Sequence, residues 1–174
     1  DMGVNMAGNC IVDDEACREA GRQEIIRRWY TGMNRLVEGD AEKSEVTKIE
    51  FLMKQAGVTA SNRPVVHAAL LKAEVTGAPA AALELPDGRI VTGKTSELLG
   101  ASAAVLLNAV KTLGDIPDEI KLISPTVIEP VQTLKVKYLG SKNPRLHTDE
   151  ILIALSMNAA SDPNAAHALE QLKK

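Results

Sequence analysis

The stretch GRIVTGKT, Gly88–Thr95, decides the fold of this chain because it fits two incompatible structures. It matches the phosphate-loop pattern, in which a glycine-rich bend points N–H groups at phosphates and a helix begins at the lysine. However, Pro86, Asp87 and Gly88 form a typical turn, and glycine supplies the positive φ that other residues resist. Residues 89–92 include three β-branched side chains, Ile90, Val91 and Thr92, which favours a pleated strand. We therefore predict a hairpin of two short strands here instead of a phosphate loop.

Helical patterns fill the 76 residues before this hairpin. Helix-favouring caps and stops predict three helices: Asp13 to Gly39, Ser44–Ala56 with Ser44 as N-cap, and a helix that Ser61 or Asn62 caps and that runs to Thr76 with Pro64 in its first turn. The sequence TGAP then interrupts the pattern. We predict a domain boundary near Gly77, with a helical subdomain over 1–76 and an α/β subdomain over 77–174.

The segment after the hairpin mixes helical and extended patterns. We expect a helix over Ser96–Leu113 and a strand over Glu119–Ser124. A further helix should lie near Pro125, on one side of Pro130 only. Thr148 should cap the next helix, and Asp162 with Pro163 should begin the last one. The fold class is therefore α/β, or α+β.

Composition restricts the partners and the compartment. Apolar residues make up 45% of the chain and aromatic residues 2%, so aliphatic side chains must form the core. A net charge of −3 provides no positive field for nucleic acid or an anionic membrane. There is no membrane-length apolar run and no signal sequence, which predicts a cytoplasmic protein. Cys10 and Cys17 lack the paired spacing of a zinc site, and their role stays open.

The order hairpin, helix, strand, proline, helix is similar to the three-layer fold of the cytidine deaminases. These enzymes hold zinc with His or Cys at the starts of two helices and move a proton with a Glu. The corresponding stretches contain Glu97 and Glu129 but neither His nor Cys. We therefore predict a deaminase-like subdomain without zinc ligands and no metal site.

A polar cluster, Leu139–Glu150, is the best candidate for chemistry. Lys142 and Arg145 suit an anion, and His147 is a candidate proton carrier. The alternative is a solvated loop whose Thr148 caps a helix and whose acids favour the positive helix end. The candidate catalytic residues are His147, Asp149 and Glu150, and the candidate ligand-binding residues are Asn5, Asn9, Lys94, Thr95, Ser96, Lys142, Asn143 and Arg145.

Other reaction signatures are missing. The chain has no Gly-x-Ser-x-Gly and no His-Glu-x-x-His, and Cys10 and Ser102 have no histidine nearby in sequence. His67 and His167 lie in helical patterns and are interpreted as packing or surface residues. Whether the chain is part of an enzyme therefore stays open.

Long segments of the chain resemble a known family. The stretches DMGVNMAGNCIVDDEA, IEFLMKQAG, APAAALELPDGRIVTGKTSELLGASAAVLLNAVKTL and YLGSKNPRLHTDEILIALS resemble the C-terminal part of the bacterial family known as domain of unknown function 1846, or UPF0371-type proteins. The resemblance implies a fragment of a longer protein whose N-terminal half carries a different, nucleotide-site-like segment. It also implies a helical subdomain followed by a deaminase-like one.

Two main functional hypotheses follow, beside a third in which a zinc-free deaminase-like fold binds a nucleobase-sized ligand. In the first, the loops Asp1–Cys10, Lys94–Ser96 and Ser141–Glu150 complete a ligand or nucleotide site whose core lies in the N-terminal half of the same protein. In the second, the chain is a structural module in which the helix over Ser96–Leu113 and the helical subdomain form a homo-oligomer. In both hypotheses the principal partner is the rest of the protein.

Overall fold

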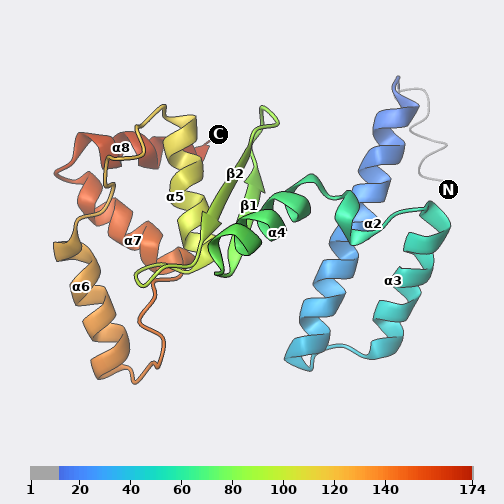
Figure 1. Ribbon diagram of the computed structural model, residues 1–174, viewed down its shortest axis with the longest axis horizontal. Coiled ribbons are helices and arrows are strands. Elements are labelled where there is room, and N and C mark those ends of the chain that lie inside the picture. Colours follow the sequence, from blue (N-terminus) through green and yellow to red (C-terminus); the bar gives the residue numbers. More distant parts are fainter. Residues whose placement is uncertain (1–11, 174) are drawn as a thin grey trace. The chain divides into compact units, whose positions relative to one another are not determined.

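Helices make up most of the chain in the computed structural model, which describes residues 12–173 (Figure 1). The chain folds into two compact units, one up to Arg63 and one from Pro64 onward. The second unit includes the helix α4 (Pro64–Thr76), which packs on the strands that follow it. No helix of the described residues is both long enough and apolar enough to cross a membrane.

The first unit is a helical hairpin. Its helices are α2 (Asp14–Glu38) and α3 (Lys43–Ala56), followed by a 3₁₀ turn, η2 (Ala60–Asn62). The Asp13 carboxylate caps α2 by accepting a hydrogen bond from the Ala16 N–H at 2.9 Å. Glu42, and not the predicted Ser44, is the N-cap residue of α3. Ile26, Met53 and Val58 form the small core of this unit.

The predicted hairpin is confirmed. Strands β1 (Ala80–Glu84) and β2 (Ile90–Lys94) pair antiparallel, with Ala82 opposite Thr92. Gly88 has a φ of 81° in the turn. The residues that match the phosphate-loop pattern therefore form a turn and a strand, and no helix begins at Lys94.

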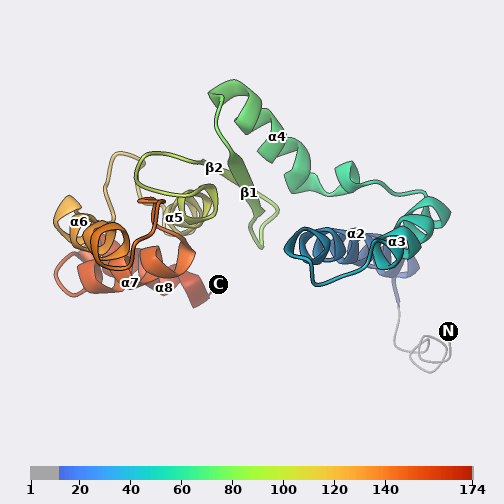
Figure 2. The ribbon, with the colours of Figure 1, turned by 90° about the horizontal axis from the view of Figure 1, so that it is seen from below.

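Gly93 brings β2 into direct contact with the backbone of α5 (Ala101–Leu113). A Cβ atom added at Gly93 would lie 2.2 Å from the Val105 nitrogen and 2.6 Å from its Cα. The glycine is thus required for close packing of strand on helix. Helix α4 also packs on both strands but hardly on α5, so the two helices cover opposite faces of the hairpin (Figures 1 and 2).

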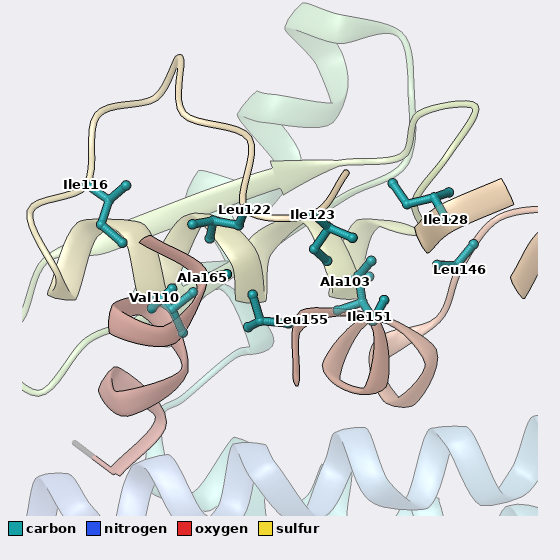
Figure 3. Close-up of a cluster of buried hydrophobic side chains, with 12 residues drawn as sticks. Ala103, Val110, Ile116, Leu122, Ile123, Ile128, Leu146, Ile151, Leu155 and Ala165 are labelled. Atoms are coloured by element: carbon teal, nitrogen blue, oxygen red, sulfur yellow. The ribbon is translucent and has the colours of Figure 1, made fainter. Parts of the chain in front are cut away.

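The main core of the second unit lies on the other side of α5 (Figure 3). Helices α7 (Thr148–Ala159) and α8 (Pro163–Glu170) pack on each other and on α5, and the turn η4 (Gln171–Lys173) ends the described chain. The fully buried members of this core are aliphatic: Ala103, Leu146, Ile151, Ala154, Ala165 and Ala168. The Asp162 side chain caps α8 as predicted, accepting from the Asn164 N–H at 2.8 Å.

Two predictions about the segment that follows β2 are wrong. The helix expected from Ser96 begins at Ala101, because Ser96 instead accepts the N–H groups of Leu98 and Leu99 through its hydroxyl. The strand expected over 119–124 is an irregular loop. Its Leu122 and Ile123 are buried in the core, and the Asn158 side chain donates to the Leu122 carbonyl at 3.0 Å. The apolar run therefore signals burial and not strand pairing.

The helix after Pro125 also differs from expectation. Pro130 lies inside α6 (Pro125–Thr133), so the prediction that it confines the helix to one side is wrong. A π-helical turn, η3 (Leu134–Tyr138), continues α6. The N-cap of α7 is His147, which places the predicted cap, Thr148, at the first helical position.

The Gly93→Ala substitution is expected to destabilise the second unit. The new methyl group would overlap backbone atoms of α5, which cannot rotate away, so overpacking should cost about 3 kcal/mol or more. Gly21→Ala is the matched control, because no atom lies within 4 Å of its added methyl and alanine favours the helix. Thermal unfolding should show a lower midpoint for Gly93→Ala and an unchanged or higher midpoint for the control. Equal midpoints would contradict the close contact.

Candidate ligand-binding site

Two segments far apart in sequence meet beside the start of α5. The Leu146 N–H donates to the Leu98 carbonyl at 2.8 Å, and the Gly100 N–H donates to the Leu146 carbonyl at 3.1 Å. These bonds form a short parallel bridge between Leu99 and Leu146. Because Leu146 is fully buried, the meeting point, which we call the loop junction, is anchored in the core.

Arg145 ties the same two loops on the solvent side of the junction. Its Nε donates to the Ser96 carbonyl at 2.7 Å. The side chain is exposed and makes no ion pair with any described residue. Since a guanidinium has five N–H donors, its terminal nitrogens remain available to an anion.

The first turns of two helices also meet here. Thr148, at the start of α7, donates from its hydroxyl to the Ser102 hydroxyl near the start of α5, at 3.2 Å. The early N–H groups of a helix lack partners inside the helix and favour negative charge. The loop junction therefore combines a cation with the positive ends of two helices.

A partly buried ion pair supports the loop junction. Lys135 in η3 is 9% exposed, and its ammonium donates to the Glu150 carboxylate at 2.8 Å and to the Arg145 carbonyl at 2.7 Å. The same Glu150 oxygen accepts the His147 N–H at 2.7 Å. Lys135 thus fixes both the loop that carries Arg145 and the start of α7.

Glu150 is held in its charged form. Burial by itself would raise its pKa, but hydrogen bonds from the Lys135 ammonium and the His147 backbone outweigh burial and lower the pKa below its ordinary value. Glu150 is therefore a poor proton donor near neutral pH. Its geometry suits a positioning role better than the catalytic role that the sequence suggests.

An apolar cavity of about 280 Å³ adjoins the loop junction. Leu98 and Leu99 of the junction line it together with Ile151 from the first turn of α7. The remaining lining comes from α5, the loop before α6, and α6: Ala104, Leu107, Asn108, Lys111, Asp118, Ile120, Lys121, Leu122, Ile123 and Ile128. A mainly aliphatic hollow with a few polar groups is typical of small-molecule sites. A second, shallow hollow in the first unit is lined by Trp29, Met53 and Val58 among others.

The structure brings together part of the predicted site. Ser96, Asn143 and Arg145 lie at the loop junction, and Asn143 orients the loop by accepting the Arg145 N–H at 3.1 Å. The Asn143 amide also lies 3.4 Å from His147 Nε2.

The other predicted site residues are more dispersed. Lys142 and Asp149 are exposed. Lys94 ends β2, and the Thr95 N–H donates to the Pro79 carbonyl, which extends the hairpin. Asn5 and Asn9 lie outside the described residues, as does Cys10, while Cys17 is a free, exposed thiol.

Lys135 is a site residue that the sequence patterns did not predict. The signal that could have found it is helical spacing, because Lys135 follows Ile128 by seven residues and Val131 by four, both on the inward side of α6. A lysine at such a position must bury its stem and find partners for its ammonium. A search for reactive residue types in polar loops misses a buried lysine on the inward side of a helix.

The described residues contain no group of three or more His, Cys, Asp or Glu side chains that could hold a metal ion. The polar groups at the loop junction are instead a guanidinium, hydroxyls and amides. These groups suit an anionic or hydrogen-bonding organic ligand.

Comparison with protein families identifies the chain. Residues 61–174 match the model described as domain of unknown function DUF1846, C-terminal, and residues 1–57 match its N-terminal counterpart. The chain therefore belongs to the DUF1846 family, as the quoted segments predict.

Similar proteins come from several bacteria. A UPF0371 protein of Corynebacterium aurimucosum is 56% identical over 174 residues, which cover 100% of this chain and 35% of that protein. UPF0371 proteins of Corynebacterium diphtheriae and Streptococcus pneumoniae are each 54% identical, over 99% of this chain and 35% of their own length. The chain thus spans about a third of the length of the relatives that it matches.

Lys135→Met is expected to destabilise the second unit by about 3 kcal/mol. The substitution leaves the Glu150 carboxylate and the Arg145 carbonyl without their buried donor. Lys137→Met is the matched control, since Lys137 is exposed two residues along the same turn and should change stability by less than about 0.5 kcal/mol. Chemical denaturation followed by circular dichroism measures both. Equal losses of stability in the two variants would show that the ion pair between Lys135 and Glu150 does not stabilise the unit.

The Glu150 pKa predicts a specific acid response. Because the folded pKa lies below the unfolded value of 4.5, the ion pair contributes fully above that value and is lost as the pH falls through the folded pKa. Glu150→Gln should therefore be less stable than the wild type at pH 7, and the difference should shrink toward pH 3. The comparison of unfolding midpoints against pH measures this. A difference that stays constant with pH would contradict the account.

Proposed function

We propose that this chain completes a ligand site in the longer DUF1846 protein, with the loop junction binding an anionic group and the adjacent cavity holding an apolar body. The main supporting observation is the bond from Arg145 to the Ser96 carbonyl, which joins residues 49 apart in the sequence close to Leu98 and Leu99, two residues that line the cavity. The core of the site and any chemistry then lie in the two thirds of the protein outside this chain.

The arrangement of charge favours an anion. Two further hydrogen bonds hold the backbone of Arg145 in place. The Lys135 ammonium donates to the Arg145 carbonyl, and the Arg145 N–H donates to the Asn143 side chain. An arginine with a fixed loop backbone loses less freedom on binding than a mobile one. Lys142, exposed on the same loop, adds a second positive charge.

The dimensions of the cavity favour a small ligand. Its volume of about 280 Å³ is near the lower end for small-molecule sites. The polar residues that line it are Asn108, Lys111, Asp118 and Lys121. The Asn108 amide already donates to the Thr92 carbonyl, and the Lys111 ammonium to the Asp118 carbonyl. A ring or short aliphatic group with a phosphate or carboxylate at one end would suit the apolar cavity and the cationic loop junction together.

We further propose that the unit from Pro64 is a deaminase-like subdomain that uses its fold for binding. The hairpin followed by α5 and then by a proline-initiated α6 supports this interpretation. The irregular segment at 119–124 departs from it, since a third strand is expected there. Fold analogy alone does not assign a reaction.

A structural role is the second candidate, and the exposed face of α4 supports it. Leu70, Leu71 and Val75 are each at least half exposed on this helix. Helix α5, in contrast, buries Ala103, Val105 and Val110 within its own unit. The sequence suggests association through the helix over Ser96–Leu113 and through the helical subdomain of residues 1–76. Of these, α4 within residues 1–76 has the exposed apolar face that supports this hypothesis.

Binding to the full-length protein tests the proposed site. We expect one or more of ATP, AMP and acetyl phosphate to raise its melting temperature, because a ligand held by the native state stabilises it. Arg145→Ala should weaken that ligand by about 10-fold or more, as expected for a lost charge-assisted contact. Arg145→Lys should recover part of the affinity.

Lys173→Ala is the control, since Lys173 is an exposed cation in η4 that pairs with Glu170. It should leave the affinity unchanged. A ligand that binds Arg145→Ala and wild type equally would exclude the loop junction as its site.

A further inference from the structure

The two outer edges of the hairpin differ in whether their backbone groups have hydrogen-bond partners. Two backbone hydrogen bonds mark the ends of the ladder between β1 and β2. The Leu85 N–H donates to the Arg89 carbonyl, and the Thr95 N–H donates to the Pro79 carbonyl. In an antiparallel pair the residues between such bonded pairs turn their backbone groups outward. Ala80, Ala82 and Glu84 therefore present N–H and carbonyl groups along the outer edge of β1.

The outer edge of β2 is partly closed by a neighbouring helix. Asn108 of α5 donates from its side-chain amide to the Thr92 carbonyl at 2.9 Å. The edge of β1 has no equivalent within residues 12–173, where the sheet consists of these two strands and no side chain bonds to the outward groups of Ala80, Ala82 or Glu84.

The side chains along β1 do not block pairing either. Natural proteins protect open strand edges with Lys, Pro or inward-pointing charges. Ala80 and Ala82 are small and uncharged, and Glu84 lies at the far end of the strand beside the turn. In addition, α4 and α5 cover both faces of the hairpin, so further pairing is possible only at its edges.

We propose that β1 is an interior strand in the full-length protein, paired along its outer edge with an extended segment of the same polypeptide from outside this chain. The relatives supply the length, because about two thirds of each lies beyond the matched part. A segment tethered in the same protein also has a high effective concentration at the edge. Main-chain bonds to a small-residue edge require no particular side chains from the added strand.

Residue-resolved hydrogen exchange on the full-length protein tests the proposal with an internal control. The amides of Ala81 and Leu83 belong to the hairpin ladder and should exchange slowly in any case. If a third strand pairs with β1, the Ala82 and Glu84 amides should also exchange at least about 100-fold more slowly than unstructured amides. Fast exchange at Ala82 and Glu84 beside slow exchange at Ala81 and Leu83 would overturn the proposal. Protection that disappears on dilution would assign the edge to a second copy and would also overturn it.

A proline substitution gives an independent measurement. Ala82→Pro removes only an outward N–H, which an edge strand tolerates and an interior strand does not. Ala82→Val is the matched control, since it keeps the N–H while adding more bulk than alanine. We expect Ala82→Pro to lower the melting temperature of the full-length protein by several degrees more than Ala82→Val. Similar midpoints for the two variants would place β1 at a free edge.

Discussion

The contact between Gly93 and the backbone of α5 is the constraint on which the second unit depends. No side chain fits between β2 and Val105, so the strand lies directly on the helix. This contact fixes α5, whose other faces carry the main core and line the cavity. The start of α5 in turn receives the loop that carries Leu146 and Arg145.

The same glycine explains why the sequence resembles a phosphate loop. Both structures need a residue without a side chain, one to let a helix approach and the other to let a phosphate approach. In this chain Gly93 lets helix α5 approach the strand, and Gly88 separately provides the left-handed turn of the hairpin. The pattern match therefore arises from two glycines with two different structural roles.

Features with strong local signals could be predicted from the sequence. The hairpin, the helices α2, α4 and α8 and the family follow from turn residues, caps and long motifs. Prediction failed where tertiary contacts decide. The run at 119–124 has strand-like residues, but Leu122 and Ile123 serve as core anchors, and Pro130 is accepted within α6. For the candidate site, the loops were identified, but Lys135 was not, because its role depends on burial that the sequence shows only through helical spacing.

A crystal structure of the full-length protein grown with ATP would distinguish the hairpin from a phosphate loop at residues 88–95. We expect Ala82 opposite Thr92 in the hairpin, Gly93 against the Val105 backbone, and no nucleotide phosphate on the Gly93 and Lys94 amides. A triphosphate enclosed by residues 88–95, with a helix beginning at Lys94, would contradict this expectation.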